Sequence, residues 1–132
     1  MTTRTTELAS QLVAIPSYVS PTQNEKEIIE FLAQYTKEKL PQLTITEAPV
    51  KEGDRSNLYM TGSKQPRIVF VGHVDTVQPS DGWRTDPLTP TIVGDRLYGL
   101  GSADMKGSIA SLLIALQTVD ARLINEVAVL LY

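Results

Sequence analysis

A short apolar run that ends in polar residues constrains the fold of this chain most. Residues 67–71 read Arg-Ile-Val-Phe-Val, a composition typical of strands buried in parallel sheets, and Gly-His-Val-Asp follows at 72–75. Apolar residues at helical spacing occur before and after this run, so the order of elements predicts an α/β fold. In such folds ligand sites form beyond the carboxyl ends of strands, and we therefore expect a site at residues 72–77.

The other expected elements follow from apolar periodicity and from helix-ending residues. One helix is expected over residues 6–14, capped by Thr5 or Thr6 and closed before Pro16, because proline disfavours helical geometry in the residue before it. A second helix is expected over residues 25–40, where apolar residues recur at i, i+3, i+4 and i+7. The remaining expected elements are strands at 43–47, 57–61 and 126–132, a hairpin joining 90–93 to 96–98, and a helix over 105–118.

Size and composition narrow the class of partner. The chain has 132 residues, which suits a single domain, and its net charge of −3 offers no basic surface for nucleic acid or for an anionic membrane. It has no apolar leader and no apolar run of about 20 residues, so we expect a cytoplasmic protein. Because the chain has no cysteine and His73 is its only histidine, a metal would have to be held by that imidazole and by carboxylates.

His73 and Asp75 lie two residues apart in an extended segment, so we expect their side chains on the same side of the chain. A neutral imidazole can bind a divalent cation through one nitrogen while the other nitrogen donates a hydrogen bond to a carboxylate, which fixes the tautomer. The simpler alternative is a histidine that merely pairs with a neighbouring aspartate at the end of a strand. Taken alone, the His-x-Asp spacing favours this alternative.

A glycine-rich segment at residues 97–107 reads Leu-Tyr-Gly-Leu-Gly-Ser-Ala-Asp-Met-Lys-Gly and places Asp104 at the expected start of a helix. It is not a nucleotide-binding loop, because Asp104 stands where the dinucleotide pattern needs Gly or Ala and because its charge would repel a phosphate. Three alternatives to a functional role remain open: a helix N-cap for Asp104, a solvated first-turn position for Lys106, and a loop anchor for Trp83.

Taken together, these segments resemble one family, the di-zinc peptidases and deacylases that include acetylornithine deacetylase, succinyl-diaminopimelate desuccinylase, aminoacylase and carboxypeptidase G. Residues 72–77, then Trp83 and Asp86-Pro87, then residues 94–107 follow the family signature in order and with compatible gaps, although Leu88 stands where relatives often have Phe. The sequence of residues 97–107 is most similar to the corresponding segment of acetylornithine deacetylase. The resemblance implies a three-layer α/β/α sandwich with a mixed, mostly parallel sheet.

The resemblance also implies a role for each site residue. His73 would be the terminal ligand of one zinc ion, Asp104 the carboxylate that bridges two zinc ions, and Asp75 the catalytic-site carboxylate that orients His73. The family tends to have a cis peptide bond after the bridging carboxylate, which would be Asp104–Met105. Such enzymes hydrolyse the amide bond of an N-acyl amino acid or a peptide through a metal-activated water, and cobalt or manganese also suits these ligands.

The sequence departs from the family pattern at its end, on the apolar run 126–132. In the family the catalytic Glu and further zinc ligands follow that strand, as does a lid domain with dimer contacts. Residues 1–132 are therefore expected to be the N-terminal part of a catalytic domain, without its second half and without the lid and dimerisation domain. We expect weak metal binding and no turnover from these residues alone, and the complete protein can be a homodimer.

Two hypotheses of different class follow. The first is a zinc amidohydrolase of amino-acid biosynthesis that resembles acetylornithine deacetylase, with succinyl-diaminopimelate desuccinylase or a carboxypeptidase-type peptidase as alternatives. Its substrate would be a small N-acyl amino acid or a peptide. The second is a non-catalytic α/β fragment or binding module that binds a partner through the open edge of its sheet. Metal affinity distinguishes the two hypotheses.

Overall fold

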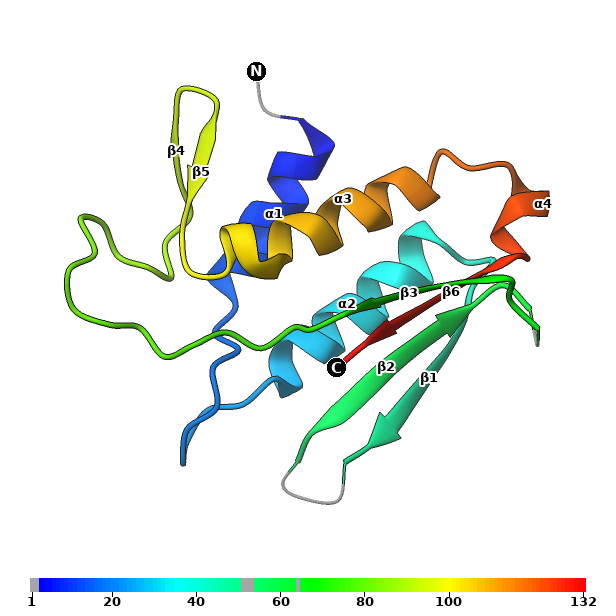
Figure 1. The fold of residues 1–132 in the computed structure, drawn as a ribbon, viewed down its shortest axis with the longest axis horizontal. Coiled ribbons are helices and arrows are strands. Elements are labelled where there is room, and N and C mark those ends of the chain that lie inside the picture. The colour runs from blue at the N-terminus through cyan, green and yellow to red at the C-terminus, as the bar shows by residue number, and fades with distance from the viewer. Residues whose placement is uncertain (1–2, 51–53, 64) are drawn as a thin grey trace.

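The computed structural model of the chain describes residues 3–50, 54–63 and 65–132. It confirms the α/β class, with helices and strands in mixed order along the chain (Figure 1). The elements are α1 (Arg4–Ala14), α2 (Lys26–Lys39), β1 (Thr44–Pro49), β2 (Ser56–Thr61), β3 (Ile68–Gly72), β4 (Thr91–Val93), β5 (Arg96–Tyr98), a π-helical segment η1 (Ser102–Lys106), α3 (Gly107–Leu116), α4 (Ala121–Ile124) and β6 (Val127–Leu131).

Four strands form the main sheet in the order β1-β2-β6-β3, and β4 and β5 form a separate antiparallel hairpin that projects away from it (Figure 1). The expected predominance of parallel pairs is wrong for these strands. Pairs β1–β2 and β2–β6 are antiparallel, and β3–β6 is parallel. A parallel pair needs a crossover connection, and only the passage from β3 through α3 to β6 supplies one here.

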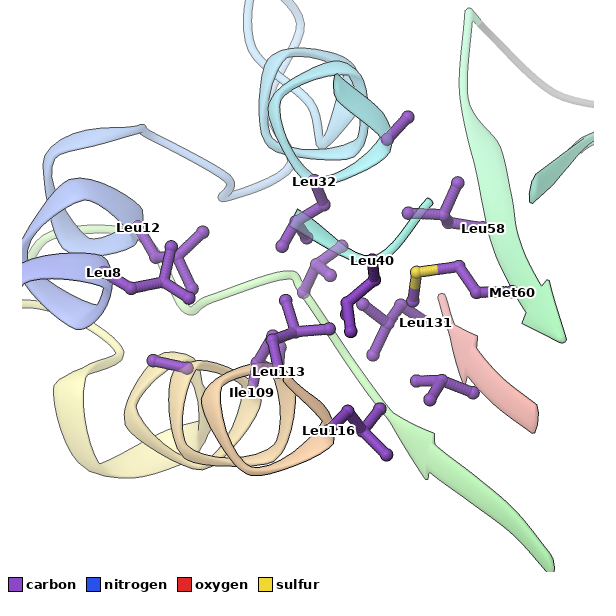
Figure 2. Packing of buried hydrophobic residues seen from close by; sticks show 14 of the residues in the cluster. Leu8, Leu12, Leu32, Leu40, Leu58, Met60, Ile109, Leu113, Leu116 and Leu131 are labelled. Carbon is purple, nitrogen blue, oxygen red and sulfur yellow. The ribbon is translucent and has the colours of Figure 1, made fainter. Parts of the chain in front are cut away.

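The core lies between the sheet and the helices. Leu58 pairs with Leu131 and Met60 with Val129, so these side chains share one face of the sheet. The buried side chains of α1, α2 and α3 belong to the same cluster, so all three helices cover that face (Figure 2). The described residues therefore form two layers, and the second helical layer of the expected sandwich is not among them. The labelled core residues in Figure 2 are Leu8, Leu12, Leu32, Leu40, Leu58, Met60, Ile109, Leu113, Leu116 and Leu131.

Strand β3 differs from its expected environment. Its composition predicts a strand buried on both faces, but the side chains of Ile68, Val69, Phe70 and Val71 are 40% to 57% exposed. The physical reason is position, because β3 lies at the edge of the sheet and pairs with β6 alone among the described strands. Local composition records the apolar character of a strand but not its place in the sheet.

Helix ends also differ in detail. Thr3 caps α1 by accepting a hydrogen bond from the Thr6 backbone nitrogen at 3.2 Å, so the expected caps at Thr5 and Thr6 are wrong. The short helix α4, which Asp120 caps, has no counterpart in the sequence prediction. In the described part of the chain, every helix is too short or too polar to cross a bilayer.

Candidate metal centre

His73 lies where two neighbouring strands end together. It follows β3 directly, and hydrogen bonds from the Tyr132 nitrogen to the Gly72 oxygen (3.1 Å) and from the Val74 nitrogen to the Tyr132 oxygen (2.8 Å) hold the backbone on either side. Val74 is buried, which fixes the chain just beyond the imidazole. The site expected at residues 72–77 thus forms at the carboxyl ends of the parallel pair β3–β6.

Both nitrogens of the His73 ring face carboxylates. Nδ1 lies 3.2 Å from Asp75 Oδ1 and 3.2 Å from the Asp75 backbone oxygen, which confirms that His73 and Asp75 share a side. Nε2 lies 2.9 Å from Asp104 Oδ1. The structure therefore brings together all three residues that the sequence singled out, and their roles in metal binding and catalysis stay predictions.

The Asp104 carboxylate is carried by the irregular segment η1. Asp104 has φ −136° and ψ 95°, values outside the helical region, and the peptide bond to Met105 is cis, which confirms the expectation from the family. The first residue flanking α3 is Lys106, and no side chain caps that helix. The helix N-cap alternative for Asp104 is therefore wrong, and its side chain, 84% exposed, is available to a ligand.

Contacts by Met105 hold this segment against the end of β3. Its Sδ accepts a hydrogen bond from the His73 backbone nitrogen at 3.3 Å. A Cβ built on Gly72 would lie 3.1 Å from Met105 Cε, so a glycine at this position leaves room for the methionine. The sequence analysis missed this contact, because nothing in the pattern shows that residues 105 and 72 meet.

The pKa of the His73 imidazole is set by its partial burial and by the two carboxylates beside it. Desolvation lowers the pKa of the His73 imidazole, but the hydrogen bond to Asp104, the Asp75 backbone oxygen and the charges of both carboxylates together outweigh it. The pKa of His73 is therefore raised above its ordinary value of 6.5. This shift shows that the site favours positive charge at the imidazole.

A hollow of about 340 Å³ opens above the pair, lined by His73, Asp75, Trp83 and residues 99–104. Trp83 is 39% exposed and forms part of the wall of this hollow. Its position is therefore not only that of the loop anchor considered from the sequence. A larger hollow of about 960 Å³ lies between the first turn of α1 and the β4–β5 hairpin. It contains neither His73 nor Asp75, so the smaller hollow is the better candidate for chemistry.

The donor set suits a divalent cation of the zinc type. Two ligands of one tetrahedral zinc ion lie roughly 3.3 Å apart, given bonds of about 2.0–2.2 Å, and the His73 and Asp104 donor atoms are 2.9 Å apart. Asp75 faces the other ring nitrogen, as a carboxylate that fixes the ligand tautomer does. Within residues 3–50, 54–63 and 65–132, no group of three or more His, Asp or Glu side chains converges on one point.

Comparison with known sequences points to one family. The sequence model of peptidase family M20/M25/M40 matches residues 69–131, which include His73, Asp75 and Asp104. The acetylornithine deacetylase of Photorhabdus laumondii is 36% identical over 125 residues, which cover 91% of this chain and 32% of that protein. The succinyl-diaminopimelate desuccinylase of Nitrosococcus oceani is 39% identical over 114 residues, which cover 84% of this chain and 28% of that protein. The chain thus spans less than a third of the length of these relatives.

Solved structures share the fold. The crystal structure of an M20 family metallo-carboxypeptidase from Sulfolobus solfataricus matches 98% of this chain and 30% of its own, with a TM-score of 0.79 and 21% identity. Human carnosine dipeptidase 1 matches 96% of this chain and 31% of its own, with a TM-score of 0.73 and 22% identity. At these identities the likeness establishes the mixed sheet with its helices.

Proposed function

We propose that this chain, whose residues 69–131 match the sequence model of peptidase family M20/M25/M40, contributes to a metal-dependent hydrolase of amide bonds, with His73 and Asp104 as metal ligands. The observation that carries the proposal is the 2.9 Å approach of His73 Nε2 to Asp104 Oδ1, while Nδ1 faces Asp75. These atoms are the donor types that zinc accepts, and manganese and cobalt are also compatible with them. We propose two zinc ions in the whole protein, with Asp104 as the bridging carboxylate.

The residues of this chain would prepare the site in three ways. Asp75 accepts a hydrogen bond from Nδ1 and so keeps the lone pair of Nε2 available to a cation. Asp104 supplies negative charge at the mouth of the hollow, and Trp83 supplies an apolar wall against which a substrate can rest. A divalent cation bound at His73 and Asp104 would add Lewis-acid polarisation of the scissile carbonyl and activation of water.

The proposed substrate is an N-acyl amino acid or a peptide. The sequence of residues 97–107 and the 36% identity to an acetylornithine deacetylase support deacetylation of an N-acetylated amino acid as the reaction. The 39% identity to a succinyl-diaminopimelate desuccinylase supports the alternative of a succinylated substrate. We also propose that the chain is part of a catalytic domain and acts in the cytoplasm, and that its partner is a small molecule rather than nucleic acid or membrane.

The test is an amide hydrolysis assay on the whole protein. The metal is removed with a chelator, then Zn²⁺, Co²⁺ or Mn²⁺ is restored, and amine release is measured with N-acetylornithine, N-succinyl-diaminopimelate and a dipeptide. We expect metal-dependent release from at least one of these substrates, and loss of that release in His73→Ala. The matched control is Asp95→Asn, which replaces an exposed carboxylate at the β4–β5 turn. This variant should keep full activity.

Two results would contradict this proposal. Metal-dependent hydrolysis that survives in His73→Ala would remove His73 from the site. Absence of hydrolysis with all three substrates, together with absence of bound metal, would favour the alternative class of a non-catalytic binding module.

A further inference from the structure

Lys106 is the most deeply buried charged side chain in the described part of the chain, with 1% of its surface exposed. The solvated first-turn position considered from the sequence is therefore wrong. The other buried charge, Glu25, pairs with Arg55, whereas the Lys106 ammonium has no ion pair among the described residues. Burial lowers the pKa of Lys106 to about 8. Burying an ammonium is costly, so a specific contact must justify it.

That contact joins η1, which carries Asp104 and is called the Asp104 loop below, to the end of another helix. Lys106 Nζ donates a hydrogen bond of 2.7 Å to the backbone oxygen of Ile15, the residue that caps the C-terminus of α1. The C-terminal end of a helix carries partial negative charge, which favours a cation there. The aliphatic part of the side chain passes beneath Gly101, where a Cβ would lie 3.2 Å from Lys106 Cδ.

The residues that follow Ile15 also hold the loop that begins at His73, which we call the His73 loop. The backbone oxygen of Ser17 accepts a hydrogen bond from the Thr76 nitrogen at 3.2 Å, and Tyr18 pairs with Thr76 as a parallel β-bridge. Gln78 Nε2 donates to the Val19 oxygen at 3.1 Å. We call residues 15–19 the docking segment. Both loops that carry the candidate ligands are thus bound to one short segment that follows α1.

We propose that Lys106 is a positioning residue, whose ammonium ties the Asp104 loop to the docking segment and so sets the separation of Asp104 from His73. An apolar side chain of equal length would fill the same space but could not bind the Ile15 carbonyl. The relevance to metal binding rests on the proposed function, whereas the positioning itself is a property of the metal-free chain.

The first test compares Lys106→Met with the unaltered chain. Methionine keeps much of the aliphatic length and removes the donor. In the metal-free protein we expect hydrogen exchange to become about tenfold faster at the amides of Ser102, residue 106 and Gly107, which close this loop. In the whole protein the zinc affinity, measured by titration calorimetry, should fall by about tenfold as well.

A matched control separates local positioning from general stability. Thr36→Val removes another buried polar group, the Thr36 hydroxyl of α2. This hydroxyl donates a hydrogen bond to Met60 Sδ with a length of 3.1 Å, and neither residue belongs to the docking segment. This variant should lower the unfolding midpoint without changing exchange in the Asp104 loop or zinc affinity. If Lys106→Met leaves both loop exchange and zinc affinity within about twofold of the unaltered chain, positioning by Lys106 is excluded.

Chemical rescue gives the sharper test, because the chain has no cysteine. Lys106→Cys is alkylated in the unfolded state with 2-bromoethylamine, which restores an ammonium at nearly the lysine length, or with 1-iodopropane, which restores the length alone. The aminoethyl form should recover slow loop exchange and the propyl form should not. Equal behaviour of the two forms would overturn the proposal. Rescue of exchange, together with absence of zinc binding by the whole protein, would uphold the positioning and contradict the proposed function.

Discussion

His73 Nε2 lies 2.9 Å from Asp104 Oδ1, although 31 positions separate the two residues in the sequence. The chain leaves the sheet at His73, passes through the β4–β5 hairpin, and returns through η1 before entering α3. Because α3 lies within the crossover between the parallel strands β3 and β6, its entry at η1 meets the carboxyl end of β3. The approach of these two side chains is thus a consequence of topology.

Replacement of Asp75 by asparagine tests how the imidazole is oriented. Asp75→Asn removes the charge beside Nδ1 but keeps the size of the side chain, so we expect zinc affinity to fall by about 10- to 100-fold, as for other carboxylates that orient a ligand histidine. The side chain is half exposed, and the unfolding midpoint should change little. Titration calorimetry measures the affinity, with Asp95→Asn as control. Equal zinc affinity in Asp75→Asn and the unaltered chain would show that Asp75 does not orient His73.

Gly101 offers a test of loop geometry with a matched control. Gly101 has φ +77°, and a Cβ there would lie 2.7 Å from Thr76 Cγ2, so Gly101→Ala combines backbone strain with a clash. Gly94 has φ +63° with open space around it, so Gly94→Ala introduces strain alone. We expect a loss of about 1 kcal/mol in the free energy of unfolding for Gly94→Ala, and of about 2–3 kcal/mol for Gly101→Ala. Urea denaturation measures both losses, and equal losses would contradict the tight approach at Gly101.

The buried ammonium of Lys106 predicts a dependence of stability on pH. Its pKa is about 8 in the folded chain and near 10.5 when unfolded. Between these values the unfolded chain binds more protons, so the free energy of unfolding should gain about 3 kcal/mol from this group as pH rises through that window. The Lys106→Met variant has no titrating ammonium at this position and so lacks this contribution. The difference in unfolding free energy between the two proteins, measured by urea denaturation across this range, should change by that amount, and parallel curves would contradict the burial of the charge.

Local sequence pattern predicted the parts of the fold that depend on neighbouring residues. The helices near residues 6–14 and 25–40 and the hairpin turning at Gly94-Asp95 were predicted from periodicity and turn residues, and the structure confirms them within a few positions. His73 and Asp75 were predicted to share a side because an extended chain alternates its side chains, and their contact confirms this.

What depends on distant parts of the chain could not be predicted from local pattern. The burial of Lys106 could not be predicted, and a solvated position was left open, because this burial depends on the Ile15 carbonyl from a segment 91 positions away. The apolar composition of β3 did not reveal that it lies at the sheet edge. The approach of Asp104 to His73 was anticipated from family resemblance, since neither helical period nor strand alternation relates positions so far apart.

The central claim is that His73 and Asp104 bind one cation together, and a double-mutant cycle tests it most directly. Zinc affinity is measured by titration calorimetry for the whole protein in four forms: unaltered, His73→Ala, Asp104→Asn and the double variant. If both side chains hold the same ion, each single change should weaken binding by at least about tenfold and the double change should weaken it by much less than the product of the two effects. Single variants that keep the affinity of the unaltered chain, or effects that simply multiply, would contradict the account.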